Sequence, residues 1–474
     1  FTATNTTSSP VTAIITVRAQ ILNTTETISC NGTSRSFTIT VNPTPSVNAV
    51  TNQLLCANTV TTPINFDGPV AGTTYSWTNN NTAIGLAASG TGSIPSFTTV
   101  NNQTSAVTAT ITVTPLYTNA GVTCTGAPIS FTITVNPIAT VNTVANQVLC
   151  NGASTAAINF SSPATGGTVT YNWTNSAASI GIAAAGTGNI PTFIATNATT
   201  TPIVATITAT PTFTNGAVSC VGTPITFTIT VNPTATVNAV ANQVLCNGSS
   251  TTAIAFTSPN SGGGGSNVVF NWVNNTPSIG LAASGTGNIG SFAANNTGST
   301  PVTATITVTP VYTNAGVTCT GTSITFTITV NPTPTVNVVS NQTVCNGSST
   351  AAVNFTGAII GTVYNWTNST PSIGLAASGT GNIGSFTATN ATAAPVTATI
   401  TVTPSYTNGA VTCTGTPTTF TITVNPVPTV NTVTNQVVCN AASTTAVNFT
   451  GATAGTVYSW TNSNPSIGLA ASGT

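Results

Sequence analysis

The sequence almost lacks ionisable side chains. Of its 474 residues, two are basic and two are acidic, and there is no histidine. The four charged residues are Arg18, Glu26, Arg35 and Asp67, so residues 68–474 contain none. General acid–base catalysis needs a group that exchanges a proton at working pH, and a serine or threonine nucleophile needs a base beside it. We therefore predict that the chain is not an enzyme and has no catalytic residue.

The same scarcity excludes several classes of ligand. Calcium and magnesium require carboxylate oxygens, and zinc requires imidazole or clustered thiolates. Nucleic-acid binding depends on lysine and arginine, and the chain has only two such residues. We expect no metal, no cofactor and no nucleic-acid partner. No stretch approaches the ~18 uninterrupted apolar residues of a membrane span, so none is expected in this segment. A hydrophobic content of 40% is sufficient for buried cores and argues against disorder.

The sequence repeats itself with a period of 94 to 99 residues. The repeat is marked by the tryptophans Trp77, Trp173, Trp272, Trp366 and Trp460. Each unit closes with "FTITVNP". The predicted organisation is a partial repeat at 1–43, complete repeats at 44–137, 138–233, 234–332 and 333–426, and a partial repeat at 427–474. This period fits a small independent domain. Because both ends fall within a repeat, we expect a piece of a longer protein.

Within a unit, apolar or β-branched residues alternate with threonine. The segments "TATITVTP" (303–310) and "TFTITVNP" (325–332) have the period of two that is typical of half-buried strands. Clusters of Gly, Asn and Pro separate such segments as turns. Seven or so short strands in ~95 residues, with a tryptophan on a central strand, predict an all-β tandem array of immunoglobulin-like or PKD-like β-sandwich domains. The five tryptophans are predicted to be core residues rather than platforms for sugars.

The motif "GTGNIG" at 285–290 and 379–384 matches the glycine pattern of a dinucleotide-binding loop. Such a loop needs a helix after it and an acidic residue about twenty positions later. Here turn and strand patterns follow, and no acidic residue lies downstream. Proline replaces the third glycine at 90–95 and 186–191. The motif is therefore predicted to be a turn between strands.

Ten cysteines, two per repeat, predict disulfides and an oxidising, extracellular setting. Since no charged or imidazole neighbour lowers their pKa, they are not predicted to be catalytic. Two pairing schemes fit the spacing. One joins each early cysteine to the Cys of the last hairpin in the same repeat, as Cys56–Cys124, Cys150–Cys220, Cys246–Cys319 and Cys345–Cys413. The other pairs Cys30 with Cys56, and their equivalents, across the repeat junction. Proline-rich junctions favour an extended chain, so we predict the pairing within a repeat.

The segments "PTPTVNVVSNQTVCNGSSTAAVNFTG" (332–357), "VYNWTN" (363–368) and "ATITVTPSYTNGAVTCTGTPTTFTITVNP" (398–426) carry a family resemblance. They resemble the PKD-like and Ig-like repeats of very large surface proteins of Bacteroidetes, which are typically exported by type IX secretion and include gliding-motility adhesins. The resemblance extends to essentially every repeat. The Gly-Asp-Gly turn of true PKD domains is replaced here by "WTNSTPSIG" (366–374). The resemblance implies an extracellular cell-surface stalk or adhesin, and it identifies no ligand.

Three functions fit these observations. The first is a structural stalk or filament that displays another part of the protein. The second is an adhesin whose repeats bind glycans, surfaces or sister fibres through avidity. The third, a sugar-binding module of a hydrolase, would need an exposed row of aromatic residues. A net charge near zero also favours self-association into fibres or bundles. Triplets such as Asn341-Gln342-Thr343 and Asn390-Ala391-Thr392 match the glycosylation acceptor but are expected by chance in so Asn- and Thr-rich a chain.

Overall fold

A computed structural model of the chain describes residues 1–22, 25, 29–261 and 267–474. Glu26 and the glycine-rich insertion at 262–266 lie outside these residues. The described chain consists of strands joined by loops and single 3-10 turns, without any α-helix. Consistent with this, none of its helical segments has the length and hydropathy that a membrane span requires.

The described chain divides into two compact units. The first comprises residues 1–234 together with 313–319, and the second comprises 235–261, 267–312 and 320–474. Each unit therefore holds a partial repeat and complete sheets. The division does not follow the predicted repeat boundaries, because residues 313–319 of the third repeat belong with the first unit. The predicted boundaries themselves remain a prediction.

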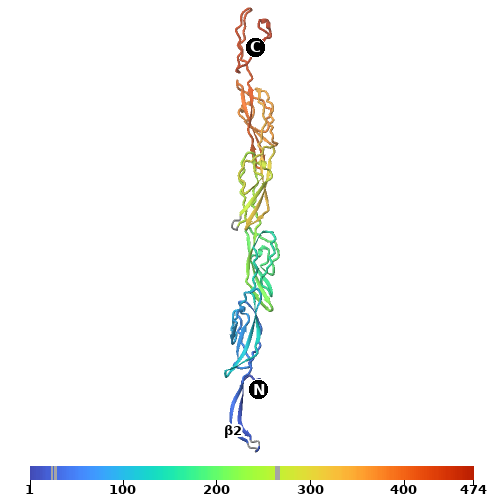
Figure 1. Cartoon of the computed structure of the whole chain (residues 1–474). Helices are drawn as coiled ribbons and strands as arrows, with labels where there is room; N and C mark the ends of the chain where they lie inside the picture. Colours follow the sequence, from blue (N-terminus) through green and yellow to red (C-terminus); the bar gives the residue numbers. More distant parts are fainter. Residues whose placement is uncertain (23–24, 26–28, 262–266) are drawn as a thin grey trace. The chain divides into compact units, whose positions relative to one another are not determined.

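The first unit begins with a two-stranded hairpin and contains two larger sheets. The partial repeat forms β1 (Val11–Leu22) and β2 (Ser29–Val41), seen at the N-terminal end in Figure 1. The repeat at 44–137 forms β3 (Gln53–Cys56), β4 (Thr74–Asn79), η1 (Thr82–Ile84), β5 (Ser89–Thr91), β6 (Val107–Asn119), β7 (Val122–Thr125) and β8 (Ile129–Asn136). The repeat at 138–233 forms β9 (Gln147–Cys150), β10 (Thr168–Asn175), η2 (Ala178–Ile180), β11 (Ala185–Thr187), β12 (Ile203–Asn215), β13 (Val218–Val221) and β14 (Ile225–Asn232).

The same elements recur in the remaining chain. The repeat at 234–332 forms β15 (Gln243–Cys246), β16 (Asn267–Asn274), η3 (Pro277–Ile279), β17 (Ser284–Thr286), β18 (Val302–Asn314), β19 (Val317–Thr320) and β20 (Ile324–Asn331). The repeat at 333–426 forms β21 (Gln342–Cys345), β22 (Val363–Asn368), η4 (Pro371–Ile373), β23 (Ser378–Thr380), β24 (Val396–Asn408), β25 (Val411–Thr414) and β26 (Thr418–Asn425). The final partial repeat forms β27 (Trp460–Thr461), η5 (Pro465–Ile467) and β28 (Ser472–Gly473).

Every complete repeat builds a sheet of the same topology. In the first, the order is β3-β8-β6-β4-β5, with β7 paired to β6 outside this path. The early strand β3 runs parallel to the last strand β8, and the other pairs are antiparallel. A second, irregular layer is held by isolated bridges such as Ile64↔Ile94. The tryptophan strand β4 pairs with the long strand β6, and β6 pairs in turn with the last strand β8, which is the C-F-G order of an immunoglobulin-like sandwich. The protein is thus an all-β array of such domains.

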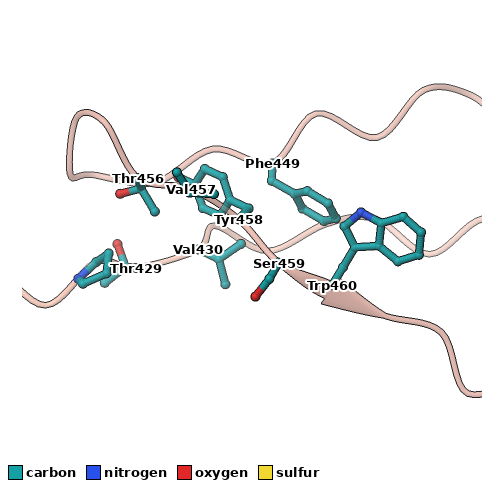
Figure 2. A pocket seen from close by; sticks show the side chains of 9 residues that line it. Thr429, Val430, Phe449, Thr456, Val457, Tyr458, Ser459 and Trp460 are labelled. Carbon is teal, nitrogen blue, oxygen red and sulfur yellow. The ribbon is translucent and has the colours of Figure 1, made fainter. Parts of the chain in front are cut away.

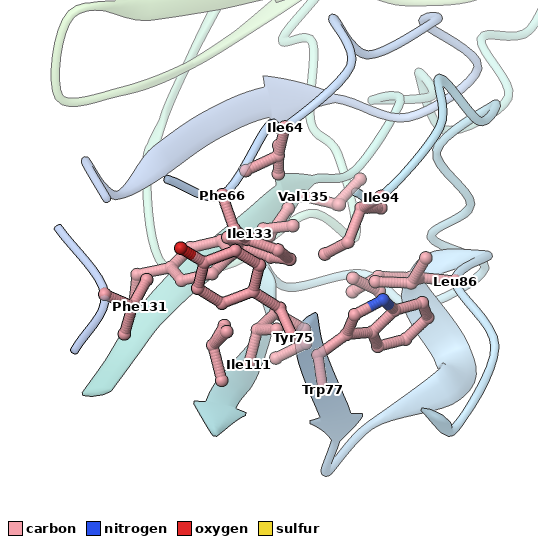
Figure 3. Close-up of a cluster of buried hydrophobic side chains, with 14 of the residues drawn as sticks. Ile64, Phe66, Tyr75, Trp77, Leu86, Ile94, Ile111, Phe131, Ile133 and Val135 are labelled. Carbon is pink, nitrogen blue, oxygen red and sulfur yellow. The ribbon is translucent and has the colours of Figure 1, made fainter. Parts of the chain in front are cut away.

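The core of each repeat lies between the two layers. In β24, Ala398, Ile400 and Val402 are buried while the alternating threonines face outward, as expected for a strand with one buried face. Figure 3 shows Tyr75 and Trp77 of β4 packed among core residues of both layers, including Ile64, Phe66, Leu86, Ile94, Ile111, Phe131, Ile133 and Val135. Four of the five tryptophans are buried in this way, namely Trp77, Trp173, Trp272 and Trp366. Trp460, in the final partial repeat, is half-buried.

The "GTGNIG" segment contacts the tryptophan ring instead of forming a nucleotide loop. Its first glycine, Gly379, lies in β23, and a Cβ added there would be 2.3 Å from Cζ2 of Trp366. Its second glycine, Gly381, has a φ of +75°, which favours glycine in the following turn. The third, Gly384, has no atom within 4 Å of an added Cβ, so this position has room for the proline that stands there at 95 and 191. The segment is a strand end and a turn, as the sequence predicts.

Candidate functional site

The cysteines connect successive repeats. Disulfides join Cys56 to Cys220, Cys150 to Cys319, and Cys246 to Cys413, each with a Cα–Cα distance of 5.5 Å. Each bond links the end of an early strand to the hairpin of the following repeat. Both partners of every bond lie in the same compact unit. We call each disulfide, with the asparagine pair described below, a junction site.

The predicted pairing within a repeat is therefore wrong. That scheme was Cys56–Cys124, Cys150–Cys220, Cys246–Cys319 and Cys345–Cys413, and none of these four bonds forms. Cys56 lies opposite Asn136, where β8 ends and β6 begins, whereas Cys124 lies opposite Tyr117 near the other end of β6. About ten strand residues at ~3.3 Å each separate the two ends, or ~33 Å. A disulfide requires Cα atoms within ~7 Å.

The alternative pairing of Cys30 with Cys56 does not form either, because Cys30 is unpaired. The bonds observed join residues that are 164, 169 and 167 positions apart. The described cysteines without a partner are Cys30, Cys124, Cys345 and Cys439. The observed bonds join the early-strand cysteine of one repeat to the hairpin cysteine of the next repeat. For each of the four unpaired cysteines, the partner that this pattern requires is not among the 474 residues.

A long strand carries the hairpin cysteine beyond its own sheet. β6 has 13 residues but pairs with β8 only from Val107 to Val113, and its last four residues, Leu116 to Asn119, pair with β7. The two strands are joined by Ala120 and Gly121, both with positive φ, which is the two-residue turn that matches strand twist. The equivalent hairpin of the second repeat places Gly216 within reach of Leu54 on β3. The strand overhang thus delivers Cys220 to Cys56.

Paired asparagines accompany the hairpin at each junction. Asn136, the final residue of β8, accepts a hydrogen bond at Oδ1 from Nδ2 of Asn215, the final residue of β12, at 2.9 Å. The same bond recurs at the other junctions, from Asn119 to Asn42 (2.9 Å), from Asn314 to Asn232 (2.8 Å) and from Asn408 to Asn331 (2.8 Å). Asn136, Asn232 and Asn331 are fully buried. Sequence reasoning missed these residues, although the recurrence of Asn in "VNP" and "YTN" was the available signal.

The junction sites can fasten repeats together but contain no ionisable side chain. The asparagine side chains are neutral amides, so the hydrogen bond between them does not change with pH and is not screened by salt. Across the part of the chain that the structure describes, no three His, Cys, Asp or Glu residues come close enough to hold a metal ion. The chemistry available at the junctions is therefore covalent cross-linking in an oxidising setting and its reversal by reductant.

A pocket in the final partial repeat is an incomplete core. It is lined by Pro428, Thr429, Val430, Phe449, Thr456, Val457, Tyr458, Ser459 and Trp460 (Figure 2). In the preceding repeat the equivalent residues Phe355, Tyr364 and Trp366 pack with Val402 of β24 and Phe420 of β26. The residues from 427 to 474 contain no counterpart of β24 or β26. The opening therefore belongs to the domain core and is no ligand site.

Three tyrosines on the tryptophan strands have raised pKa values that bear on stability. Burial raises the pKa of Tyr75, Tyr171 and Tyr364, with Asp67 raising that of Tyr75 further and a hydrogen bond from Thr362 opposing the shift at Tyr364. A raised pKa in the folded state means that the neutral phenol stabilises the fold. This stability is fully present below the ordinary tyrosine pKa of about 10 and is lost as pH rises above it.

We therefore expect the thermal midpoint of unfolding to stay level from about pH 5 to 9 and to fall above about pH 10. The matched control replaces all three tyrosines with phenylalanine, the residue that Phe270 already provides in the third repeat. Thermal scans with the free thiols alkylated should show a smaller alkaline decline in this variant. An equal decline in both proteins would contradict the assignment.

Comparisons with known proteins give a general likeness only. No protein-family model matches the sequence, and no curated protein sequence matches it. Among solved structures, the chain is similar to protocadherin gammaB7 EC3–6 (14% identity, 80% of this chain and 100% of that chain, TM-score 0.34). It is also similar to mouse cadherin-23 EC22–24, with 13% identity, coverage of 61% of this chain and 99% of that chain, and a TM-score of 0.31. A third similar structure is Sidekick-1 immunoglobulin domains 1–5, with 9% identity, coverage of 88% of this chain and 96% of that chain, and a TM-score of 0.24. The fold class rests on the strand order of the sheets.

Proposed function

We propose that this chain is the non-catalytic structural stalk or filament of an extracellular cell-surface protein. The observation that carries the proposal is the disulfide between each early strand and the hairpin of the next repeat. Such bonds persist in oxidising compartments, which supports an extracellular location. They fasten neighbouring domains to each other, whereas a bond inside a domain would stabilise only that domain. A chain of fastened domains is suited to holding another part of the protein at a distance.

The resemblance of the repeats to those of large Bacteroidetes surface proteins supports the same function. Export by type IX secretion, a role in gliding motility and attachment to the cell surface are parts of this proposal that rest on the resemblance alone. Self-association into fibres or bundles is a further part, since the near-absence of charge removes the repulsion between neighbouring chains.

A second function is favoured by the outward faces of the sheets. Hydroxyl pairs stand on neighbouring strands at equivalent positions, Thr108 with Thr134, Thr303 with Thr329 and Thr397 with Thr423, at 2.9 to 3.0 Å. These exposed, uncharged hydroxyl pairs recur in three of the four complete repeats, since Val204 replaces one hydroxyl in the repeat at 138–233, and they are suited to hydrogen bonding with glycans. Weak contacts of this kind would add through avidity. In this alternative the repeats are themselves adhesin modules.

Surface binding by the full chain separates the two functions. The oxidised protein, with its free thiols alkylated, is passed over a glycan array and over glass, mica and polystyrene. A stalk is expected to show no saturable retention. Retention that is abolished by free sugar would contradict the stalk function and support the adhesin function. The Thr397→Val variant, which removes one hydroxyl of a pair at constant shape, should leave the stalk unaffected and should weaken any adhesion.

A further inference from the structure

We propose that the junction disulfides turn the array into a covalent ladder, in which tension passes along the last strands and bypasses most of each repeat. This inference rests on the proposed stalk function, because it concerns how a stalk bears load. It goes beyond that function, since a stalk can hold its length at rest without any such route. The ladder follows from connectivity and needs no statement about how the two compact units are placed.

The first side of the ladder passes through two of the disulfides. Cys56 is bonded to Cys220, the chain continues from Cys220 to Cys246, and Cys246 is bonded to Cys413. The shortest covalent route from Cys56 to Cys413 therefore uses only residues 220–246. All residues between Cys56 and Cys220, and all those between Cys246 and Cys413, lie off this route.

The remaining disulfide belongs to a second side, offset by one repeat. Residues 124–150 lead to the bond between Cys150 and Cys319, and residues 319–345 continue beyond it. Two parallel routes therefore run along the chain. The segments between an early cysteine and the hairpin cysteine of the same repeat, such as 151–219, connect one route to the other. These connecting segments contain the tryptophan strands and long strands, and hence most of the core.

Strand residues form part of each route before any load is applied. Residues 220–246 comprise the end of β13, the strand β14, a linker that begins with Pro233, and the strand β15. Strands rise about 3.3 Å per residue, close to the maximum of ~3.3–3.6 Å for a fully extended chain. Midway, Asn232 of β14 lies in register with Cys150 of β9, so one route passes directly beside the disulfide of the other.

Extension of the full chain by force measures the route directly. With handles at both ends and the free thiols alkylated, the oxidised chain is expected to stretch only through residues 1–56, 220–246 and 413–474. These are about 145 residues, or ~520 Å at full extension. After reduction by dithiothreitol, all 474 residues contribute, and the limit rises to about 1,700 Å. An oxidised chain that extends as far as the reduced one would overturn the ladder while leaving the stalk function intact.

Two double variants provide a matched control. Replacing Cys150 and Cys319 with serine removes a bond that is not on the shorter route, so the limit should stay at ~520 Å. Replacing Cys246 and Cys413 with serine leaves a shortest route through residues 1–56, 150–220 and 319–474. The length at full extension then rises to about 1,000 Å.

Equal changes in the two double variants would overturn the ladder, because bonds within single repeats would all lie in series. The length at full extension is set by the number of residues on the route, so it does not depend on the stability of the variants. A non-reducing peptide map of each protein before extension should show the remaining bonds. A peptide linking Cys56 to Cys124 would also overturn the ladder.

Discussion

Replacing Gly379 with valine should destabilise the repeat at 333–426 by about 3 kcal/mol or more. A Cβ at this position would lie 2.3 Å from Cζ2 and 2.7 Å from Cε2 of Trp366. The indole is rigid and buried, with an exposed fraction of 7%, so it cannot move aside without disturbing Ile373 and Leu375 in the same core. The two γ-methyl groups of valine add to this overlap.

Amide hydrogen exchange of the full chain gives the measurement. Peptides from β22, β24 and β26 should exchange faster in the Gly379→Val variant, while peptides from β10, β12 and β14 should be unchanged. The matched control is Gly384→Val in the same motif, where an added Cβ meets no atom within 4 Å. Its effect should stay within about 0.5 kcal/mol. Equal effects of the two substitutions would show that the ring contact is not the cause.

Replacing Asn390 with alanine is expected to cost roughly 2–4 kcal/mol, because one buried side chain supplies several hydrogen bonds. Its Nδ2 donates to the carbonyl oxygens of Ala394 (2.9 Å) and Val424 (2.8 Å). Its Oδ1 accepts from the backbone N–H and the hydroxyl of Thr392, both at 2.8 Å. The side chain is 5% exposed. Alanine would leave the carbonyl of Val424 buried without this donor, and water cannot readily replace it.

Hydrogen exchange of peptides covering β26 and the segment before β24 tests this cost in the full chain. Asn365→Ala is the control, since Asn365 is exposed on β22 and its loss should change stability by less than about 0.5 kcal/mol. If both variants exchange alike, the buried asparagine has no special role. Asn390 also begins a glycosylation triplet. Because its Nδ2 is engaged in the fold, we expect intact mass to show no glycan at this position.

Much of the fold follows from local sequence pattern. The alternation in "TATITVTP" and "TFTITVNP" places the strands, and the tryptophan period places the cores, because both signals depend on residues close together in the chain. The strand at Val302–Asn314 nevertheless continues past Pro310, where the pattern predicted an end. The carbonyl oxygen of Pro310 accepts a hydrogen bond from the backbone N–H of Gly321. Pro310 lies beyond the last residue pair between β18 and β20, Val308 with Ile324, so the ladder requires no N–H at this position.

The junction sites could not be predicted in the same way. The disulfide partners depend on how far β12 extends beyond the end of β14, which the continuation through Pro211 decides. A pairing rule based on spacing considered only partners within one repeat or across one linker, and the observed bonds skip further. The sequence pattern assigns the asparagines to turns, because a single Asn beside a proline does not indicate a partner 77 to 82 residues away. Their geometry is a property of two repeats together.

The offset of the disulfides by one repeat also governs how such a gene can change. Any early strand can accept the hairpin of whichever repeat follows it, since the junction residues are alike at every position. A recombination event that inserts or deletes one whole period therefore keeps each remaining cysteine supplied with a partner. An event that removes the half of a period that carries one junction cysteine leaves its partner thiol unpaired. Length can consequently drift in steps of one repeat, while the cross-linking is inherited unchanged.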